Sequence, residues 1–380
     1  MKKTAVTCFV LLFFVLGTTG CWNLREPDQL AYIMGAGMDY TKDGQFEISS
    51  QIAIPASIGG EQGASGNDKK RFLVVSARGK NIMDAGQKLQ VQLSRSLFYG
   101  HRQTILIGHQ MAEHGIGNLV DMFVRNPKSE IRSTIIVVKD GQAKEALSIE
   151  PNFDPFISTT FVQGQSVVGI KPYYYRQLLI DALSPESQLM IPAISLTPSK
   201  KYVYAGSAIL RKDDGLKLVG YLNAEESSLA NWIVGRQTDF TITSNLNQGD
   251  GNVSLRLQKL DNHILATKKN ENMEIAIHLK GTGTVVENNS SMDPSKQNEL
   301  QLIQDQLSQS TQQSVKQVIE KVQKRYKADI LELGEEIHRQ YPMEWKTMQG
   351  NWNRVFPDLQ VTVKVELKIK DPGQTNVPIL

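Results

Sequence analysis

The sequence of 380 residues is poor in cysteine, in excess charge of one sign and in long apolar runs. Its two cysteines, Cys8 and Cys21, exclude a disulfide scaffold and a four-cysteine zinc site. The 42 basic and 39 acidic side chains leave a formal net charge of only +3, which argues against nucleic-acid binding as the main task. No run of about 18 apolar residues occurs, so no transmembrane helix is expected.

The N-terminus has the pattern of an export signal. Residues 5–16 form an uncharged, mostly apolar run that follows Lys2 and Lys3. As a helix this run spans about 18 Å, less than the bilayer hydrocarbon core of about 30 Å. The pattern therefore predicts a signal peptide over residues 1–20 rather than a membrane span.

The signal ends in small residues followed by Cys21, a pattern that resembles a bacterial lipobox. The resemblance implies cleavage between Gly20 and Cys21, a diacylglyceryl group on the Cys21 sulfur and an acyl chain such as palmitate on its new amino group. Two or three acyl chains anchor a protein stably, whereas one binds only marginally. The alternative is an ordinary secreted protein whose cysteine lies near the cleavage site by chance.

The mature sequence offers little that indicates catalysis. Gly35-Ala36-Gly37 lacks the third glycine of a dinucleotide-binding loop, because Tyr40 stands in its place. His109 and His114 are five residues apart, which misses the spacing that places two metal ligands on one helix face. Neither a phosphate loop nor a Gly-x-Ser-x-Gly elbow occurs. We therefore expect no catalytic residue, no metal site, no cofactor and no enzymatic activity.

Hydrophobic periodicity predicts an α+β protein of several domains, with mixed or antiparallel sheets flanked by helices. The expected strands are 31–40, 45–54, 71–77, 103–107, 132–138, 202–210, 216–219, 252–260, 273–279 and 359–369. The expected helices are 81–93, 111–125 with a break at 115–117, 143–147, 173–183, 223–235 and 295–340 with a bend at Gly334. Residues 55–70 and 150–172 are expected to be irregular.

The long C-terminal helical segment, followed by a final strand, has an apolar stripe with two interpretations. It packs on the C-terminal sheet, or part of it docks a partner helix. Pro185, Pro192 and Pro198 lie close together and predict a domain boundary near 195–201. We therefore expect a signal peptide at 1–20, an N-terminal region at 21–198 that holds one or two subdomains, and a C-terminal domain at 199–380.

Several motifs together resemble the Ger(x)C family of spore germination lipoproteins. They are Cys21-Trp22-Asn23-Leu24-Arg25-Glu26, Gly35-Ala36-Gly37-Met38-Asp39, Tyr99-Gly100-His101-Arg102-Gln103, Phe123-Val124-Arg125-Asn126-Pro127, Ala328-Asp329-Ile330-Leu331-Glu332-Leu333-Gly334, Tyr341-Pro342-Met343-Glu344-Trp345 and Asn351-Trp352. Their order and spacing cover essentially the whole mature chain.

This resemblance implies the non-enzymatic C subunit of a nutrient germinant receptor. Such a subunit is held by its lipid on the outer face of the inner spore membrane. It assembles with two integral membrane subunits, A and B, in a complex that responds to small nutrients. The family fold is α+β with three subdomains. Two other functions share the signal and the anchor: a solute-binding lipoprotein of a transporter, and a cell-envelope hydrolase.

Overall fold

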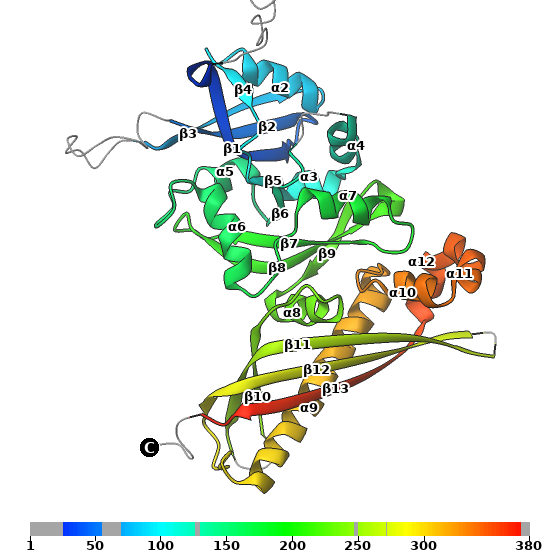
Figure 1. Ribbon diagram of the computed structural model, residues 1–380. Helices are drawn as coiled ribbons and strands as arrows, with labels where there is room; N and C mark the ends of the chain where they lie inside the picture. Colours follow the sequence, from blue (N-terminus) through cyan, green and yellow to red (C-terminus); the bar gives the residue numbers. More distant parts are fainter. Residues whose placement is uncertain (1–25, 55–69, 126–129, 247–249, 271, 374–380) are drawn as a thin grey trace, which may run out of the picture.

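The computed structural model describes residues 26–54, 70–125, 130–246, 250–270 and 272–373. The described chain forms two β-sheets that follow one another along an elongated molecule (Figure 1). Helix α8 (Ala224–Ile233) lies between them and packs on strands of both sheets. The first described residues lie at the end of the molecule away from the C-terminal sheet.

The N-terminal sheet has nine strands in the order β3-β2-β1-β5-β6-β7-β8-β9, with β4 paired to β1. These strands are β1 (Leu30–Tyr40), β2 (Phe46–Ala53), β3 (Phe72–Gly79), β4 (Ser96–Phe98), β5 (Thr104–Gly108), β6 (Thr134–Lys139), β7 (Leu189–Leu196), β8 (Tyr202–Arg211) and β9 (Lys217–Leu222). Neighbours from β1 through β5 and β6 to β7 are parallel, and the flanking pairs are antiparallel. Every residue of β5 is buried, as expected for a strand covered on both faces.

Helices cover both faces of this sheet. They are α2 (Ile82–Gln90), α3 (His109–His114), α4 (Gly117–Arg125), α5 (Ala143–Leu147), α6 (Ile157–Val167) and α7 (Tyr175–Leu183). One apolar core joins α3, α4 and α7 to the sheet, and a second joins α5 and α6 to its other face. The short 3-10 turn η1 (Pro27–Gln29) precedes β1.

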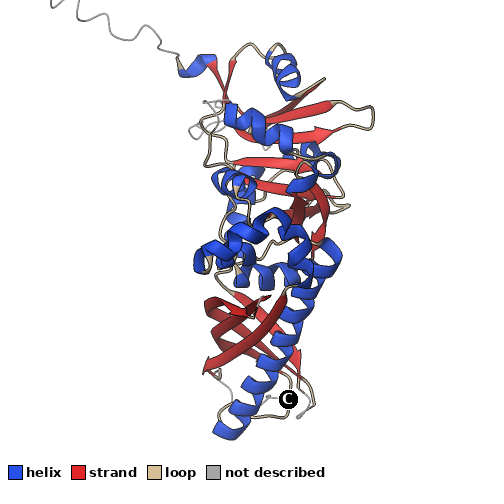
Figure 2. Cartoon of the chain, turned by 90° about the vertical axis from the view of Figure 1, so that its right-hand side faces the viewer, coloured by secondary structure: helices blue, strands red, loops and turns tan. Residues whose placement is uncertain are grey.

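The C-terminal sheet has four strands in the order β10-β11-β12-β13, of which only β12 and β13 are parallel. Its elements are β10 (Phe240–Asn245), β11 (Asn252–Lys269), β12 (Asn272–Asn288), α9 (Gln297–Glu320), a π-helical segment η4 (Lys321–Tyr326), α10 (Leu333–Gln340), α11 (Pro342–Met348), α12 (Trp352–Val355) and β13 (Gln360–Asp371). The helices from α9 to α12 form the crossover that a parallel strand pair requires. Figure 2 shows α9 running alongside the strands, and its apolar stripe packs into their core.

Helix α9 also covers the open edge of β13. Three backbone N–H groups of β13 point away from β12 and meet side chains of α9. Val365 N donates to Gln312 Oε1 at 3.1 Å, Leu367 N to Ser308 Oγ at 3.1 Å and Ile369 N to Gln304 Oε1 at 2.8 Å. Four helical residues rise about 6 Å and two strand residues about 6.6 Å, so the two spacings match. This edge ladder, formed by the three α9 side chains and their β13 partners, satisfies donors that an edge strand leaves free.

The structure confirms the α+β prediction, including the long helix and the final strand, and differs in several elements. Helix α6 lies in the stretch 150–172 that was expected to be irregular. Strand β7 includes Pro192, which lies just before the residues paired with β6, so its missing N–H removes no bond there. Strands β11 and β12 are about twice as long as expected and form one hairpin, and β10 was missed. The predicted loop at 55–70 lies almost entirely outside the described residues.

The predicted bend at Gly334 in the helix 295–340 was wrong. The chain leaves the helix earlier, at Lys327, and re-enters it after Glu332, both of which have left-handed backbone angles (φ 50° and 59°). The break at residues 115–117 is confirmed, because Gly115 (φ 109°) ends α3. The boundary proposed at 198 falls in the turn between β7 and β8, which pair in one sheet, and the division stays a prediction.

Candidate functional site

The predicted anchor residues Gly20 and Cys21 lie outside the described residues, as do residues 1–25 as a whole. Glu26 is the first described residue and lies directly before η1 and β1. In the ranges that the structure describes, no helix is long and apolar enough to cross a membrane.

The Gly-x-Gly-x-Asp motif lies on β1, where residues two apart share one face. That face meets α5. An ideal Cβ on Gly35 would lie 2.9 Å from Leu147 Cδ2, and one on Gly37 would lie 3.0 Å from Ala143 Cβ. Both distances are shorter than ordinary carbon contacts, so the glycines permit the close approach of helix to strand.

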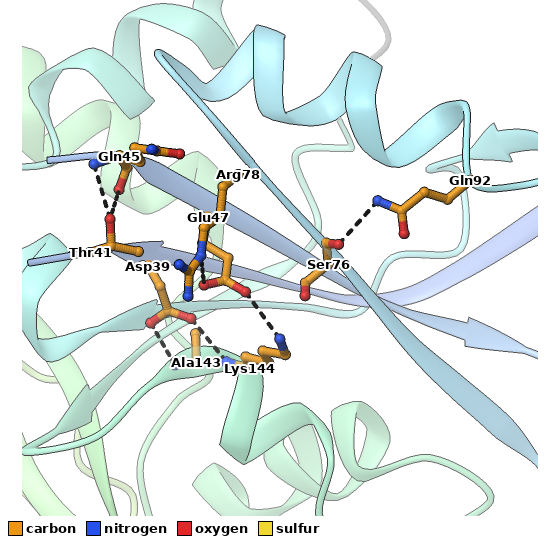
Figure 3. Close-up of polar contacts among 9 residues, drawn as sticks. All are labelled: Asp39, Thr41, Gln45, Glu47, Ser76, Arg78, Gln92, Ala143 and Lys144. Carbon is orange, nitrogen blue, oxygen red and sulfur yellow. Dashed lines mark hydrogen bonds and ion pairs between the residues drawn. The ribbon is translucent and has the colours of Figure 1, made fainter. Parts of the chain in front are cut away.

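Asp39 completes the same face and fixes the start of α5 (Figure 3). Its carboxylate accepts hydrogen bonds from the backbone N–H of Ala143 at 2.8 Å and of Lys144 at 3.0 Å. Burial raises the pKa of Asp39 to about 6, although these hydrogen bonds act in the opposite direction. Both carboxylate oxygens are engaged with the backbone, which is the role of a helix cap.

Glu47 on β2 lies beside Asp39 and is paired with cations from two directions (Figure 3). Lys144 Nζ lies 3.1 Å from Oε1, and Arg78 Nε lies 3.1 Å from Oε2. Burial alone would raise the pKa of Glu47, but hydrogen bonds from Lys144 and Arg78 hold it below its ordinary value. This cluster ties β1, β2, β3 and α5 together.

The C-terminal motifs converge on Asp329, which follows η4. Its buried carboxylate accepts from the backbone N–H of Gly334 at 2.8 Å and from Trp352 Nε1 at 3.0 Å. Burial raises its pKa to about 6, and these hydrogen bonds oppose the rise. An ideal Cβ on Gly334 would lie 3.0 Å from Trp345 Cη2 and 2.8 Å from the Glu186 carbonyl oxygen. Three motifs that are separate in the sequence therefore form one packed unit.

A charged cluster joins this unit to the N-terminal sheet. Arg236 Nη2 lies 3.2 Å from Asp181 Oδ2 on α7 and 2.6 Å from Glu332 Oε1. The Tyr173 hydroxyl donates to Asp181 Oδ2 at 2.7 Å, and its ring lies 5.4 Å from the guanidinium carbon. We call Arg236, Asp181 and Glu332 the junction cluster.

One guanidinium faces two carboxylates in the junction cluster, so one negative charge is left uncompensated. Burial, and to a smaller extent repulsion from Asp181, raise the pKa of Glu332 to about 7, whereas Arg236 acts to lower it. The two carboxylates raise the pKa of Arg236 above its ordinary value against the effect of burial. No local sequence pattern predicts this cluster, because Asp181 and Glu332 lie 55 and 96 residues from Arg236 along the chain.

The histidines take part in separate contacts. His109 Nδ1 lies 2.9 Å from the Tyr221 hydroxyl, His114 stacks on Tyr40 with centroids 3.8 Å apart, and His338 Nδ1 lies 2.7 Å from Glu186 Oε1. Within residues 26–54, 70–125, 130–246, 250–270 and 272–373, no three His, Cys, Asp or Glu side chains are grouped so that they could hold a metal ion. The motif residues thus position backbone and helices within the fold.

Comparisons with known proteins match nearly the whole chain. The family model "Spore germination protein N-terminal domain" matches residues 23–196, and "Spore germination B3/ GerAC like, C-terminal" matches residues 205–373. The putative spore germination protein YfkR of Bacillus subtilis (strain 168) is 27% identical over 98% of both chains. Spore germination protein KC of the same organism is 26% identical over 100% of this chain and 98% of its own, and spore germination protein B3 is 24% identical over 98% and 99%.

The crystal structure of the GerBC protein has the same fold. It superimposes with a TM-score of 0.60 and 20% identity, covering 90% of this chain and 99% of that chain. The two family models occur in the expected order and together span both sheets. The chain belongs to the Ger(x)C family of spore germination proteins.

Proposed function

We propose that the protein is the lipid-anchored subunit of a spore nutrient germinant receptor and is required for germination triggered by small nutrients. The observation that carries this proposal is the match of both family models, in order, to a chain that covers 98% of the length of two spore germination proteins. Asp39, Glu47 and Asp329 are engaged in contacts within the fold, where they hold helices and strands in place.

The anchor is Cys21, exposed as the new N-terminus by cleavage after Gly20. Loss of residues 1–20 removes Lys2 and Lys3 and no acidic residue, so the mature chain has 40 basic and 39 acidic side chains. With a formal side-chain charge of +1, acyl chains rather than a general excess of positive charge hold the protein at the membrane. The protein then lies on the outer face of the inner spore membrane.

The partners are the integral membrane A and B subunits. Anchoring keeps the protein in the plane of the membrane and raises its effective concentration near them, so weak contacts suffice. We retain a division into a signal peptide at 1–20, an N-terminal region at 21–198 and a C-terminal domain at 199–380. The family models, which end at 196 and begin at 205, support this division.

The experiment combines deletion with a point variant. Spores that lack the gene should lose germination to particular nutrients, and the wild-type gene should restore it. Cys21→Ala should leave the membrane fraction in cells without A and B, whereas Cys8→Ala, inside the removed signal, should stay anchored. Normal germination of the deletion strain on a broad nutrient panel, with no paralogue present, would contradict the receptor function. Membrane retention of Cys21→Ala would contradict the anchor alone.

A further inference from the structure

A hollow of about 720 Å³ lies beside the N-terminal sheet, away from the clusters described above. It is bounded by the residues before β5, the segment before β6, α6 and the start of α7. The polar side chains that line it include Arg102, Gln103, Arg132, Gln163, Tyr174 and Arg176. We call this hollow the Arg102 pocket. Arg102 belongs to the motif 99–103, whose role the family assignment leaves open.

Arg102 is a buried cation that forms no direct ion pair within the described residues. Arg102 is 4% exposed, and its side chain forms no ion pair with any described carboxylate. Nε donates to Ser133 Oγ at 3.1 Å, and Nη2 donates to the Glu130 carbonyl oxygen at 3.3 Å. Nη1 has no hydrogen-bond partner among the described residues. Buried charges are ordinarily paired, so this arrangement is incomplete.

The remaining contacts of Arg102 are with aromatic rings. Its guanidinium carbon lies 5.2 Å from the centroid of Phe123 and 5.8 Å from that of Tyr99. Burial lowers the pKa of Arg102 to about 10, and the weaker attraction of Tyr99, Tyr175 and Glu130 offsets this effect only in part. The rings and two neutral oxygens compensate the loss of water only in part.

The rim of the Arg102 pocket adds positive charge. Arg132 and Arg176 line it, and Glu130 is the only acid among the described residues of its lining. Glu130 is already engaged, because its Oε1 accepts from Arg132 Nε at 3.1 Å and from the Arg132 backbone N–H at 3.0 Å. With three arginines and one glutamate, the lining carries a formal charge of +2.

The hydrogen-bond donors that are available in the Arg102 pocket are side chains. The first backbone N–H groups of α7 are already used, since Tyr175 N donates to the Ser133 carbonyl at 2.7 Å and Arg176 N to the Ile131 carbonyl at 3.1 Å. The Arg176 guanidinium forms no ion pair within the described part of the chain. The same two backbone bonds hold α7 against the segment that Arg102 contacts, so the pocket is preformed.

We infer that the Arg102 pocket binds an oxyanion, the carboxylate or phosphate group of a small molecule or of a lipid headgroup, through Arg102 with Arg132 and Arg176 at its rim. A planar guanidinium presents paired N–H donors that match the two oxygens of such a group. The bound anion supplies the direct ion pair that Arg102 does not form within the described residues. This inference is independent of the proposed anchoring and assembly.

Calorimetric titration of the full-length chain in phosphatidylcholine nanodiscs tests whether the Arg102 pocket binds an oxyanion. The probes are inorganic phosphate and glutarate, and chloride keeps the ionic strength constant. Wild-type protein should bind at least one probe saturably. Arg176→Gln and Arg132→Gln should each weaken binding about tenfold, because each removes a charge-assisted contact. Their melting temperatures without the probe should equal that of the wild type, since both side chains lie at the rim.

Arg125→Gln is the matched control. Arg125 is an exposed arginine on α4 that pairs with Asp121 and does not line the pocket, so its loss should leave binding unchanged. Arg102→Lys keeps the charge but loses the paired donors, and it should weaken binding while the fold, checked by circular dichroism, remains. Equal loss in Arg125→Gln and Arg176→Gln would show a general charge effect and overturn the inference.

Phosphatidylglycerol nanodiscs distinguish the two sources of the anion. If a lipid headgroup fills the pocket, phosphatidylglycerol should compete with free phosphate. Phosphate binding that is seen in phosphatidylcholine should then disappear in phosphatidylglycerol, and neither Arg132→Gln nor Arg176→Gln should restore it. If the natural ligand is a free anion, binding should persist in both lipids. The inference is overturned if the folded protein binds neither probe in phosphatidylcholine. It is also overturned if an anionic partner protein binds the pocket when the probes do not.

Discussion

At the residue scale, alternate positions of β1 set how closely α5 approaches the sheet. Gly35, Gly37 and Asp39 share one face, and the sequence shows this because strand residues two apart lie on the same side. What the sequence could not show is the partner, because α5 begins 104 residues after Asp39. The motif was therefore recognisable from the sequence as a pattern, but its physical purpose required the fold.

Gly37→Ala should destabilise the protein. The added methyl group would lie 3.0 Å from Ala143 Cβ and 3.1 Å from Leu147 Cδ1, so α5 must shift. We expect the free energy of unfolding to fall by about 1–3 kcal/mol, measured by urea denaturation. Gly86→Ala is the control: its methyl group would meet only Ile48 Cδ1 at 4.0 Å, and alanine favours a helix by about 0.5–1 kcal/mol. Equal effects of both changes would contradict the close-approach argument.

The buried acids predict how stability depends on pH. Burial raises the pKa of Asp39 and Asp329 from 3.8 to about 6 and that of Glu332 from 4.5 to about 7. The folded state therefore holds these protons more tightly than the unfolded state. Their stabilising contribution is complete below the ordinary values and is lost as pH rises through the folded values.

Urea denaturation between pH 5 and 8 should accordingly show a free energy of unfolding that falls as the pH approaches 7. Glu332→Gln removes one of the three titrating groups and should reduce this slope, most clearly between pH 6 and 7. Glu225→Gln, an exposed glutamate on α8, should keep the wild-type slope. A Glu332→Gln slope equal to that of the wild type would argue against a raised pKa at this position.

At the scale of elements, the patterns with strong periodicity were the ones that the sequence predicted correctly. Strand β13 and helix α9 follow clear periods of two and of three to four residues. Helix α6 was missed because glycine and β-branched residues weaken its pattern, and its stability depends on packing against the sheet. The bend was wrongly predicted at Gly334, because the sequence does not show that the carboxylate of Asp329 accepts the first backbone N–H groups of α10, those of Leu333 and Gly334.

The edge ladder between α9 and β13 predicts a defect on its removal. Alanine at Gln304, Ser308 and Gln312 leaves three N–H groups of β13 without partners. An unpaired buried N–H costs about 1–3 kcal/mol, and we expect a total loss of about 2–4 kcal/mol because water reaches part of this edge. The uncovered edge should also pair between molecules, which size-exclusion chromatography detects as oligomers.

The matched control is alanine at Gln309, Gln313 and Gln317, which have the same spacing on the exposed face of α9. It removes three glutamines with a similar change in helix propensity and should leave both stability and the monomer peak unchanged. If both triple variants associate alike, the oligomers arise from the helix surface and not from the edge of β13.

At the scale of the whole molecule, the junction cluster and η4 connect the two sheets. Tyr326 of η4 donates its hydroxyl to the Tyr221 carbonyl oxygen of β9 at 2.8 Å, and its ring packs directly over Gly220. Arg236 adds the ionic link to Asp181. Such contacts between distant segments depend on the completed fold, so neither periodicity nor local motifs could predict them.

Arg236→Gln should weaken this connection strongly. It leaves Asp181 and Glu332 without their cation in a mostly buried setting, which typically costs about 3–5 kcal/mol. Scanning calorimetry should show one transition for the wild type and two transitions, at lower temperature, for the variant. The double variant Arg236→Gln/Glu332→Gln should recover part of the loss. Arg339→Gln, an exposed arginine paired with Glu336, should change stability by less than about 1 kcal/mol.

Because the two sheets follow one another along an elongated molecule, a rotation at one end displaces the other end. In our proposal the membrane holds it near β1, while the C-terminal sheet lies at the other end (Figure 1). Helix α9 alone, with 24 residues, extends about 36 Å. A tilt of about 10° over that length displaces its far end by roughly 6 Å, more than one helical turn. A small rocking motion at the anchored end therefore becomes a large displacement at the far end, provided that the junction between the sheets stays rigid.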